Sequence, residues 1–275
     1  MKIALCISGY FSNKCGDDLL ITNYIYDNVI NKIITPDSLD IFIHSFDKSN
    51  ENKILTKYPN AIIYVIENQI DFTSKINSQY FKYMQEQKYF NYGEYNLQSS
   101  LSFLYSRSKC IKLALEYSKE NNFDYDCIIR CRFDIGIRLK RPFNGFKPDN
   151  FVFNPNLDFS YFYSAYWNQL NAGYCDHWEV SNAKNMDLFS NIYDCVLNDM
   201  LILDSEYLKL LNFWLDSDKN NCTSNIIINK NLVTQSMQLF SYEFVHSSNN
   251  HLIQKFYMIK CDLYLKSKFL DYTKN

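Results

Sequence analysis

The sequence predicts an α/β protein with a mainly parallel central sheet flanked by helices. Apolar runs of strand length recur through the first half of the chain, and stretches with helical spacing separate several of them. Continuous apolar runs are typical of parallel strands that are buried on both faces, and their alternation with helices favours a parallel sheet. With 275 residues, of which 47% are hydrophobic and 21% charged, the chain can also fill a sizeable core.

The first part of the chain contains three such runs. Residues 2–7, 39–44 and 61–66 are rich in Ile, Leu, Val and Phe, and each is followed by polar residues. Between the first two runs, apolar residues recur at helical spacing over 17–34, and Pro36 closes that helix. The order of strand, helix and strand is the start of a crossover unit.

The middle of the chain predicts a second crossover. Residues 71–97 are polar, aromatic and weakly periodic, which indicates a loop-rich or partly helical insertion over the sheet. Residues 98–120 contain no Gly or Pro and carry a mostly apolar stripe, so they predict the longest helix. A short buried strand over 127–129 follows that helix.

The second half is less regular. We expect strands over 150–154 and 173–180, and a helix that Ser181 caps and that runs to about Cys195. Two more helices are expected near the end of the chain, over 204–216 and over 231–241. No repeat and no long linker divides the chain, so residues 1–275 are expected to form one domain.

Composition excludes several functions. The net charge of −2 and a sequence pI of about 6.1 argue against a nucleic-acid binder. The apolar start of the chain is too short for a signal peptide, and no run approaches the roughly 18 residues of a membrane helix. The nine cysteines lack Cys-x-x-Cys spacing and the four histidines lack paired spacing, which argues against a zinc framework or a histidine-based metal site. We therefore expect reduced thiols in a cytoplasmic protein.

Aromatic residues make up 17% of the chain, with 23 Tyr and 21 Phe. This abundance fits a bias toward AT-rich codons. It also fits tyrosines that line a sugar-binding cleft, because their rings stack on the faces of sugars. Composition does not separate these two explanations.

The segment 124–137 carries the strongest functional signal. Arg130, Arg132 and Asp134 are spaced by two, so an extended backbone would place all three on one face. Guanidinium groups neutralise phosphate oxygens and a carboxylate can hold a divalent metal, so the pattern suits a nucleotide diphosphate. A structural Arg–Asp network at the edge of a sheet explains the same pattern.

Two turns follow predicted strands, where α/β sheets bind ligands. Ser8, Gly9 and Tyr10 come after the first strand, and the glycine would let a base or phosphate approach the backbone; an ordinary turn is the alternative. His44 and Asp47 come after the second strand and could contact a nucleotide or ribose, or Asp47 could simply cap the turn. No Gly-x-Gly-x-x-Gly fingerprint and no P-loop is present.

Further candidates lie on other elements. Arg107 and Lys109 on the long helix could reach phosphates or could simply face solvent. Asp176, followed by His177, could act as a general base for a sugar hydroxyl or could lie in a solvated loop. A serine hydrolase lacks support because no Gly-x-Ser-x-Gly elbow occurs.

Taken in order, these segments resemble a known family. The stretches are Lys2–Phe11, His44–Asp47, Gln98–Lys109, Ile129–Asp134 and Asp176–Asp187. Over roughly residues 1–190 they are similar to bacterial glycosyltransferases of the GT-A type that use nucleotide sugars in capsule or lipopolysaccharide synthesis. The resemblance implies a nucleotide-binding half over 1–140 and an acceptor-side half over 141–275.

The resemblance also implies a donor and a metal. Such enzymes hold Mn²⁺ or Mg²⁺ with an Asp-x-Asp motif against the donor diphosphate. Here the matching triplet is Arg132-Phe133-Asp134, so Asp134 is the expected metal ligand, and Arg130 or Arg132 would assist it or replace the metal. A glycan or lipid-linked acceptor is implied, with the enzyme in the cytoplasm or at the inner face of the membrane.

Two other functions stay open at this stage. A sugar nucleotidyltransferase would share the sheet and the metal, but it usually carries a Gly-rich basic loop after the first strand, which Ser8-Gly9-Tyr10-Phe11 does not supply. A catalytically degenerate domain that binds glycans or a partner enzyme would explain why one aspartate of the metal motif is missing.

Overall fold

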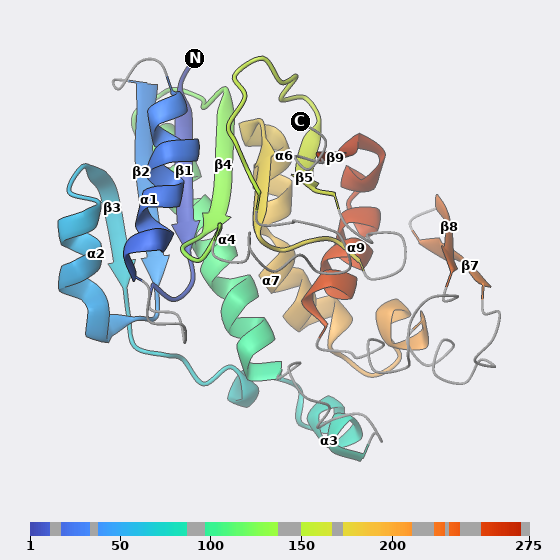
Figure 1. The fold of residues 1–275 in the computed structure, drawn as a ribbon. Coiled ribbons are helices and arrows are strands. Elements are labelled where there is room, and N and C mark those ends of the chain that lie inside the picture. Colours follow the sequence, from blue (N-terminus) through green and yellow to red (C-terminus); the bar gives the residue numbers. More distant parts are fainter. Residues whose placement is uncertain are drawn as a thin grey trace.

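A computed structural model describes residues 1–11, 18–33, 38–86, 97–136, 150–166, 173–210, 223–228, 231–236 and 249–270. Their main feature is a seven-stranded sheet with the order β3-β2-β1-β4-β6-β5-β9 (Figure 1). The strands are β1 (Ile3–Ser8), β2 (Leu39–Ser45), β3 (Ala61–Ile66), β4 (Cys127–Arg132), β5 (Phe162–Ala165), β6 (Trp178–Ser181) and β9 (Ser267–Leu270).

Most of the sheet is parallel. Strands β3, β2, β1 and β4 pair in parallel, and so do β5 and β9. Strand β6 is antiparallel to both of its neighbours, β4 and β5. The predicted class, an α/β fold with a mainly parallel sheet and an irregular mixed second half, is therefore confirmed.

Helices cover both faces of the sheet (Figure 1). Helices α1 (Asp18–Asn28) and α2 (Glu51–Lys57) lie on one face, where Ile3, Leu5 and Ile7 of β1 enter a core with Ile25 and Ile54. On the other face, Ala4 and Cys6 of β1 join a second core. The elements of that second face are α4 (Leu97–Glu120), α6 (Ala183–Ser190), α7 (Ile192–Cys195) and α9 (Asn250–Lys260). Successive side chains of β1 point to opposite faces of the sheet, so this strand contributes residues to both cores.

The elements predicted in the first half are confirmed. Helix α4 matches the predicted helix over 98–120, and β1, β2, β3 and β4 match the predicted strands. The helix expected over 17–34 is α1 followed by a 3-10 helix at Ile30–Lys32, while Pro36 lies outside the described residues. The insertion over 71–97 is partly helical, with a 3-10 helix at Thr73–Lys75 and α3 at Ser78–Glu86.

Several expectations for the second half are wrong. Residues 150–154 form no strand; instead Phe151 stacks on Trp178 with ring centroids 4.5 Å apart. Only the end of the strand expected over 173–180 is extended, as β6, and β5 was not predicted. Ser181 ends β6, and the N-cap of α6 is Asn182, whose side chain accepts from the Asn185 amide at 2.9 Å.

The helix expected over 231–241 is wrong over 231–236, and residues 237–241 lie outside the described residues. Residues Asn231–Ser236 form β8, which pairs antiparallel with β7 (Thr223–Ile228). The two segments are rich in Ile, Val and Thr, whose branched Cβ atoms favour strands over helices. Of the helix expected over 204–216, residues 206–210 are helical and the rest lies outside the described residues.

None of the helices in the described part of the chain has the length and hydropathy to cross a membrane.

A glycine in the turn after β4 allows α1 to pack closely against this turn. Gly136 has a φ of +89°, and a Cβ at this position would lie 2.3 Å from Cγ of Tyr24. The hydroxyl of Tyr24 accepts a hydrogen bond from the Phe151 amide at 2.9 Å. Replacing Gly136 would therefore disturb the contact between α1, the turn after β4 and the segment under Trp178.

We expect Gly136→Ala to lower the free energy of unfolding by about 2–6 kcal/mol, because strained backbone and overpacking each cost about 1–3 kcal/mol. Gly9→Ala is a matched control, since Gly9 has a φ of +112° but a Cβ there would meet nothing within 4 Å in the part of the chain that the structure describes. Urea titration measures both variants. Equal losses for the two would show that the Tyr24 contact contributes nothing.

Candidate active site at the end of the central strands

The chain changes direction across the sheet between β1 and β4. From β1 it continues to β2 and β3 on one side, and it returns through α4 to β4 on the other side (Figure 1). Parallel pairing puts Ser8 opposite Arg132, so the carboxyl ends of β1 and β4 lie next to each other. In open α/β sheets this switch point is where ligands bind.

Gly9 forms the open side of this switch point. Its amide donates to the His44 carbonyl at 3.1 Å, and the Ser45 hydroxyl donates to the Gly9 carbonyl at 2.7 Å. A side chain at Gly9 would meet no atom of the described residues within 4 Å. Tyr10 follows, is half exposed, and donates its hydroxyl proton to Gln69. The turn is therefore fixed by hydrogen bonds while the space beside it is open.

Arg132 and Asp134 form a two-pronged ion pair at the end of β4. Nε and Nη2 of Arg132 lie 2.7 Å and 2.6 Å from Oδ1 and Oδ2 of Asp134. The strand ends at Arg132, and Asp134 lies in the turn that follows. The side chains are 25% and 28% exposed, so solutes can reach both. Burial alone would raise the pKa of Asp134, but the adjacent Arg132 holds it below its ordinary value.

Arg130 lies on β4 two residues before Arg132 and is fully buried. Its Nε donates to the Ser8 hydroxyl at 3.2 Å, and its Nη1 donates to the Asp176 carbonyl at 2.7 Å and to Glu179 at 3.0 Å. Its Nη2 is buried and has no hydrogen-bond partner among the described residues. Arg130 therefore belongs to a buried network, which is one of the two interpretations that the sequence left open.

Glu179 on β6 is the centre of that network. Arg107 from α4 donates through Nη1 to Glu179 at 3.1 Å and to Gln254 of α9 at 2.7 Å. Arg107 and Glu179 are both 0% exposed. Burial lowers the pKa of Arg107 to about 10, opposed by Glu179, so Arg107 stays charged at neutral pH.

Phe103 of α4 lies among the three arginines, and sequence reasoning missed it. The guanidinium carbons of Arg107, Arg130 and Arg132 lie 5.0, 4.8 and 5.9 Å from the centre of its ring. Arg107 follows Phe103 by four positions on the helix, and side chains with this spacing are neighbours on a helix surface. The spacing could have indicated from the sequence that the two side chains meet. Contact with a ring face favours cations.

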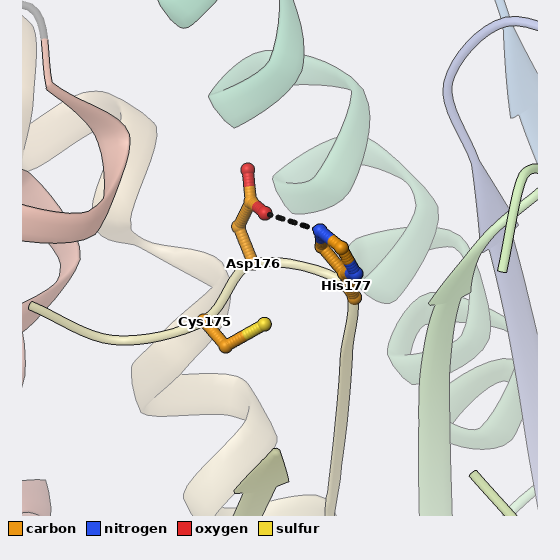
Figure 2. Close-up of side chains that lie close together, drawn as sticks. All are labelled: Cys175, Asp176 and His177. Atoms are coloured by element: carbon orange, nitrogen blue, oxygen red, sulfur yellow. Dashed lines mark ion pairs between the residues drawn. The ribbon is translucent and has the colours of Figure 1, made fainter. Parts of the chain in front are cut away.

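Asp176 lies at the edge of the cluster, on the segment that precedes β6. Its Oδ1 is 3.5 Å from Nη1 of Arg132 and 3.6 Å from Nε2 of His177. Burial alone would raise the pKa of Asp176, but the charges of His251, Arg132 and His177 hold it well below its ordinary value. Figure 2 shows Cys175, Asp176 and His177 on one short segment, and their ligand atoms all lie within 4.8 Å of one another.

The remaining predicted residues lie apart from this cluster. His44 is fully buried, with Nδ1 2.7 Å from the Ser106 hydroxyl and Nε2 2.9 Å from Glu67. Burial lowers the pKa of His44, although Glu67 opposes the shift. Asp47 accepts hydrogen bonds from Ser49 at 2.8 Å and from Asn50 at 3.0 Å, as a residue that caps a turn does. Lys109 of α4 is half-buried, and its charge acts on His44.

The residues around Asp134 do not fit a Mn²⁺ or Mg²⁺ ion as they stand. Both oxygens of Asp134 are engaged by Arg132, and the carboxylate of Asp176 contacts the same guanidinium. A hard cation needs oxygen ligands, so it would have to displace Arg132 first. The arrangement is centred on a cation already present in the protein, which suits an anionic ligand.

Comparisons with known proteins are distant. No protein-family model matches the chain, and no curated protein matches its sequence. Among solved structures, the apo form of mouse xyloside xylosyltransferase 1 is similar, with 10% identity and a TM-score of 0.38 over 98% of this chain and 84% of that chain. A likeness at this level carries no argument about activity.

We expect Glu179→Gln to destabilise the protein by about 3–5 kcal/mol, because it leaves the charges of Arg107 and Arg130 buried without their carboxylate. The control is Asp194→Asn, which removes an exposed ion pair with Lys112 at 2.7 Å and is expected to cost less than about 1 kcal/mol. Urea unfolding compares them. A loss for Glu179→Gln as small as that of the control would mean that the buried network is not what holds β4, β6 and α4 together.

Proposed function

We propose that this protein is a glycosyltransferase that moves a sugar from a nucleotide-sugar donor to a glycan acceptor. One observation carries the proposal. Arg132, partly exposed and oriented by Asp134, lies at the switch point of the sheet beside the open face of Gly9. The ordered resemblance to bacterial capsule and lipopolysaccharide glycosyltransferases supports the same class.

Arg132 is the group that would receive the donor diphosphate. Its planar fork matches two phosphate oxygens as well as it matches the two oxygens of Asp134. An incoming diphosphate would therefore exchange with the Asp134 carboxylate. The open side of Gly9 would leave room for the rest of the nucleotide, and Ser8 and Tyr10 flank that room.

The reaction forms a bond between an acceptor hydroxyl oxygen and the anomeric carbon. The bond from that carbon to the diphosphate oxygen breaks, and the leaving group carries the bonding electrons away. Arg132 would stabilise this growing negative charge, while the buried Arg130 adds positive potential from below. The hydroxyl proton passes to the leaving phosphate or to a protein carboxylate.

Asp176 is our candidate for the acceptor side of the reaction. Its pKa is held well below the ordinary value, so the group is ionised at neutral pH but is a weak base. An ionised carboxylate beside Arg132 is better suited to accept a hydrogen bond from the acceptor hydroxyl than to remove its proton. This role suits a transfer that retains configuration, in which the leaving phosphate takes the proton.

The acceptor and the location are further parts of the proposal. A lipid-linked glycan of a surface polysaccharide would place the enzyme at the cytoplasmic face of the membrane. The proposed attachment to that face is peripheral. Sedimentation with vesicles made from bacterial lipids would measure it.

A screen of nucleotide sugars for transfer or hydrolysis tests the activity. With any active donor, we expect Arg132→Ala to lower kcat by about 10²–10³-fold, the usual cost of removing a group that stabilises a leaving charge. Lys112→Ala is the control, since Lys112 pairs with Asp194 on the surface. Wild-type turnover by Arg132→Ala would remove Arg132 from the chemistry. Release of pyrophosphate from an NTP and a sugar 1-phosphate would instead identify a nucleotidyltransferase.

A second experiment separates an arginine-based site from a metal-based one. If Arg132 binds the diphosphate directly, Asp134→Asn removes a competitor, so nucleoside diphosphates should bind as tightly as before or about 2- to 10-fold tighter, and a chelator should have little effect. Calorimetry with and without EDTA measures this. Loss of binding in Asp134→Asn, or in EDTA with rescue by Mn²⁺, would assign Asp134 to a metal.

A further inference from the structure

The segment 173–177 carries a thiol and an imidazole that the proposed transfer does not use, next to the carboxylate of Asp176. Cys175 and Asp176 are buried and His177 is nearly so, and a sulfur, a carboxylate oxygen and an imidazole nitrogen lie within 4.8 Å of one another (Figure 2). This mixed set differs from the oxygen ligands that Mg²⁺ requires. Sulfur and imidazole nitrogen together are the ligands that Zn²⁺ takes.

The segment is held in place by the start of α9. The amide of Tyr174 donates to the His251 carbonyl at 3.0 Å, and Nδ1 of His251 lies 2.7 Å from the Tyr174 carbonyl. Gly173 has a φ of +87°, and a Cβ there would lie 2.1 Å from the His251 carbonyl oxygen. The close approach of the two backbones therefore requires glycine, and the donor atoms sit on a fixed segment.

His251 adds a second feature of metal sites. A carbonyl can only accept, so the contact with Tyr174 places the ring proton on Nδ1 and leaves the lone pair of the neutral imidazole on Nε2. Because His251 contacts the carbonyl of Tyr174, its ring lies beside the residue that precedes Cys175. A histidine whose Nδ1 is anchored to a backbone carbonyl is a usual neighbour or ligand of a bound metal.

We propose that Cys175, Asp176 and His177 bind one divalent transition metal ion, with Zn²⁺ preferred, and that His251 supports the site from α9. The Cys175 thiol would lose its proton to solvent as the sulfur–metal bond forms. The thiolate and the carboxylates of Asp176 and Asp134 then carry as many negative charges as the ion and Arg132 carry positive ones. This balance allows a cation to lie beside Arg132.

The inference shares Asp176 with the proposed transfer but does not rest on that transfer, because Cys175 and His177 have no part in it. Its consequence is structural: the ion would fix the segment before β6 against α9. It would also compete with Arg132 for Asp176, whose Oδ1 lies 3.5 Å from the guanidinium.

Cobalt titration of the full chain, stripped with a chelator, tests the site without any sugar or nucleotide. We expect one Co²⁺ per chain, a sulfur-to-cobalt absorption in the near ultraviolet, and loss of that absorption when Zn²⁺ displaces the cobalt. Cys175→Ser should abolish the absorption, and His177→Gln should weaken binding about 10- to 100-fold while the absorption persists.

The matched control is Cys195→Ser. Cys195 lies 3.7 Å from the Asp199 carboxylate, so it offers a thiol and a carboxylate at another place. No sulfur absorption at stoichiometric Co²⁺, or an absorption that survives Cys175→Ser, would overturn the proposal. If Cys175→Ser does not fold, as judged by circular dichroism, His177→Gln decides: unchanged affinity overturns the proposal and weakened affinity supports it.

Discussion

The ion pairs of Glu179 are the interaction on which the architecture of the second half depends. This carboxylate is completely buried on β6 and meets Arg130 of β4 and Arg107 of α4. A lone charge in this position would cost several kcal/mol, so the three side chains must be brought together for the chain to fold. They join the parallel part of the sheet to its antiparallel strand, and Gln254 extends the same network to α9.

The buried network also determines which arginine charges are not fully neutralised by carboxylates near the switch point. Two arginines share one carboxylate inside the protein, so the region below the switch point keeps an excess of positive charge. Arg130 retains a buried N–H group without a partner in the described residues. Above it, Arg132 is the arginine that solvent reaches, and it is neutralised by an aspartate that another anion can replace. Burial thus places Arg107 and Arg130 in the interior network and leaves Arg132 accessible to solvent.

The sequence predicts the first half of the fold well because each strand there is a continuous apolar run and α4 has a clear periodicity. It also predicts that Arg132 and Asp134 lie together at a strand end. It could not reveal Glu179 as the partner of Arg107 and Arg130, because the three residues come from separate elements and meet only through the sheet order. The short strands β5 and β8 were missed for a related reason: four to six residues carry little periodicity, and pairing with neighbours determines their structure.

Asp176 connects the two chemical features of the site. Its carboxylate is held near Arg132 on one side and near His177 and Cys175 on the other, while its carbonyl accepts from Arg130. One carboxylate cannot give its full negative charge to both a guanidinium and a metal ion. If an ion binds the Cys175–His177 segment as proposed, Arg132 would lose part of its hold on Asp176 and would become a stronger partner for phosphate. When no ion is bound, Asp176 and Asp134 both restrain Arg132. The position of a single aspartate at this junction would therefore couple occupancy of the proposed cation site to the affinity of the proposed anion site.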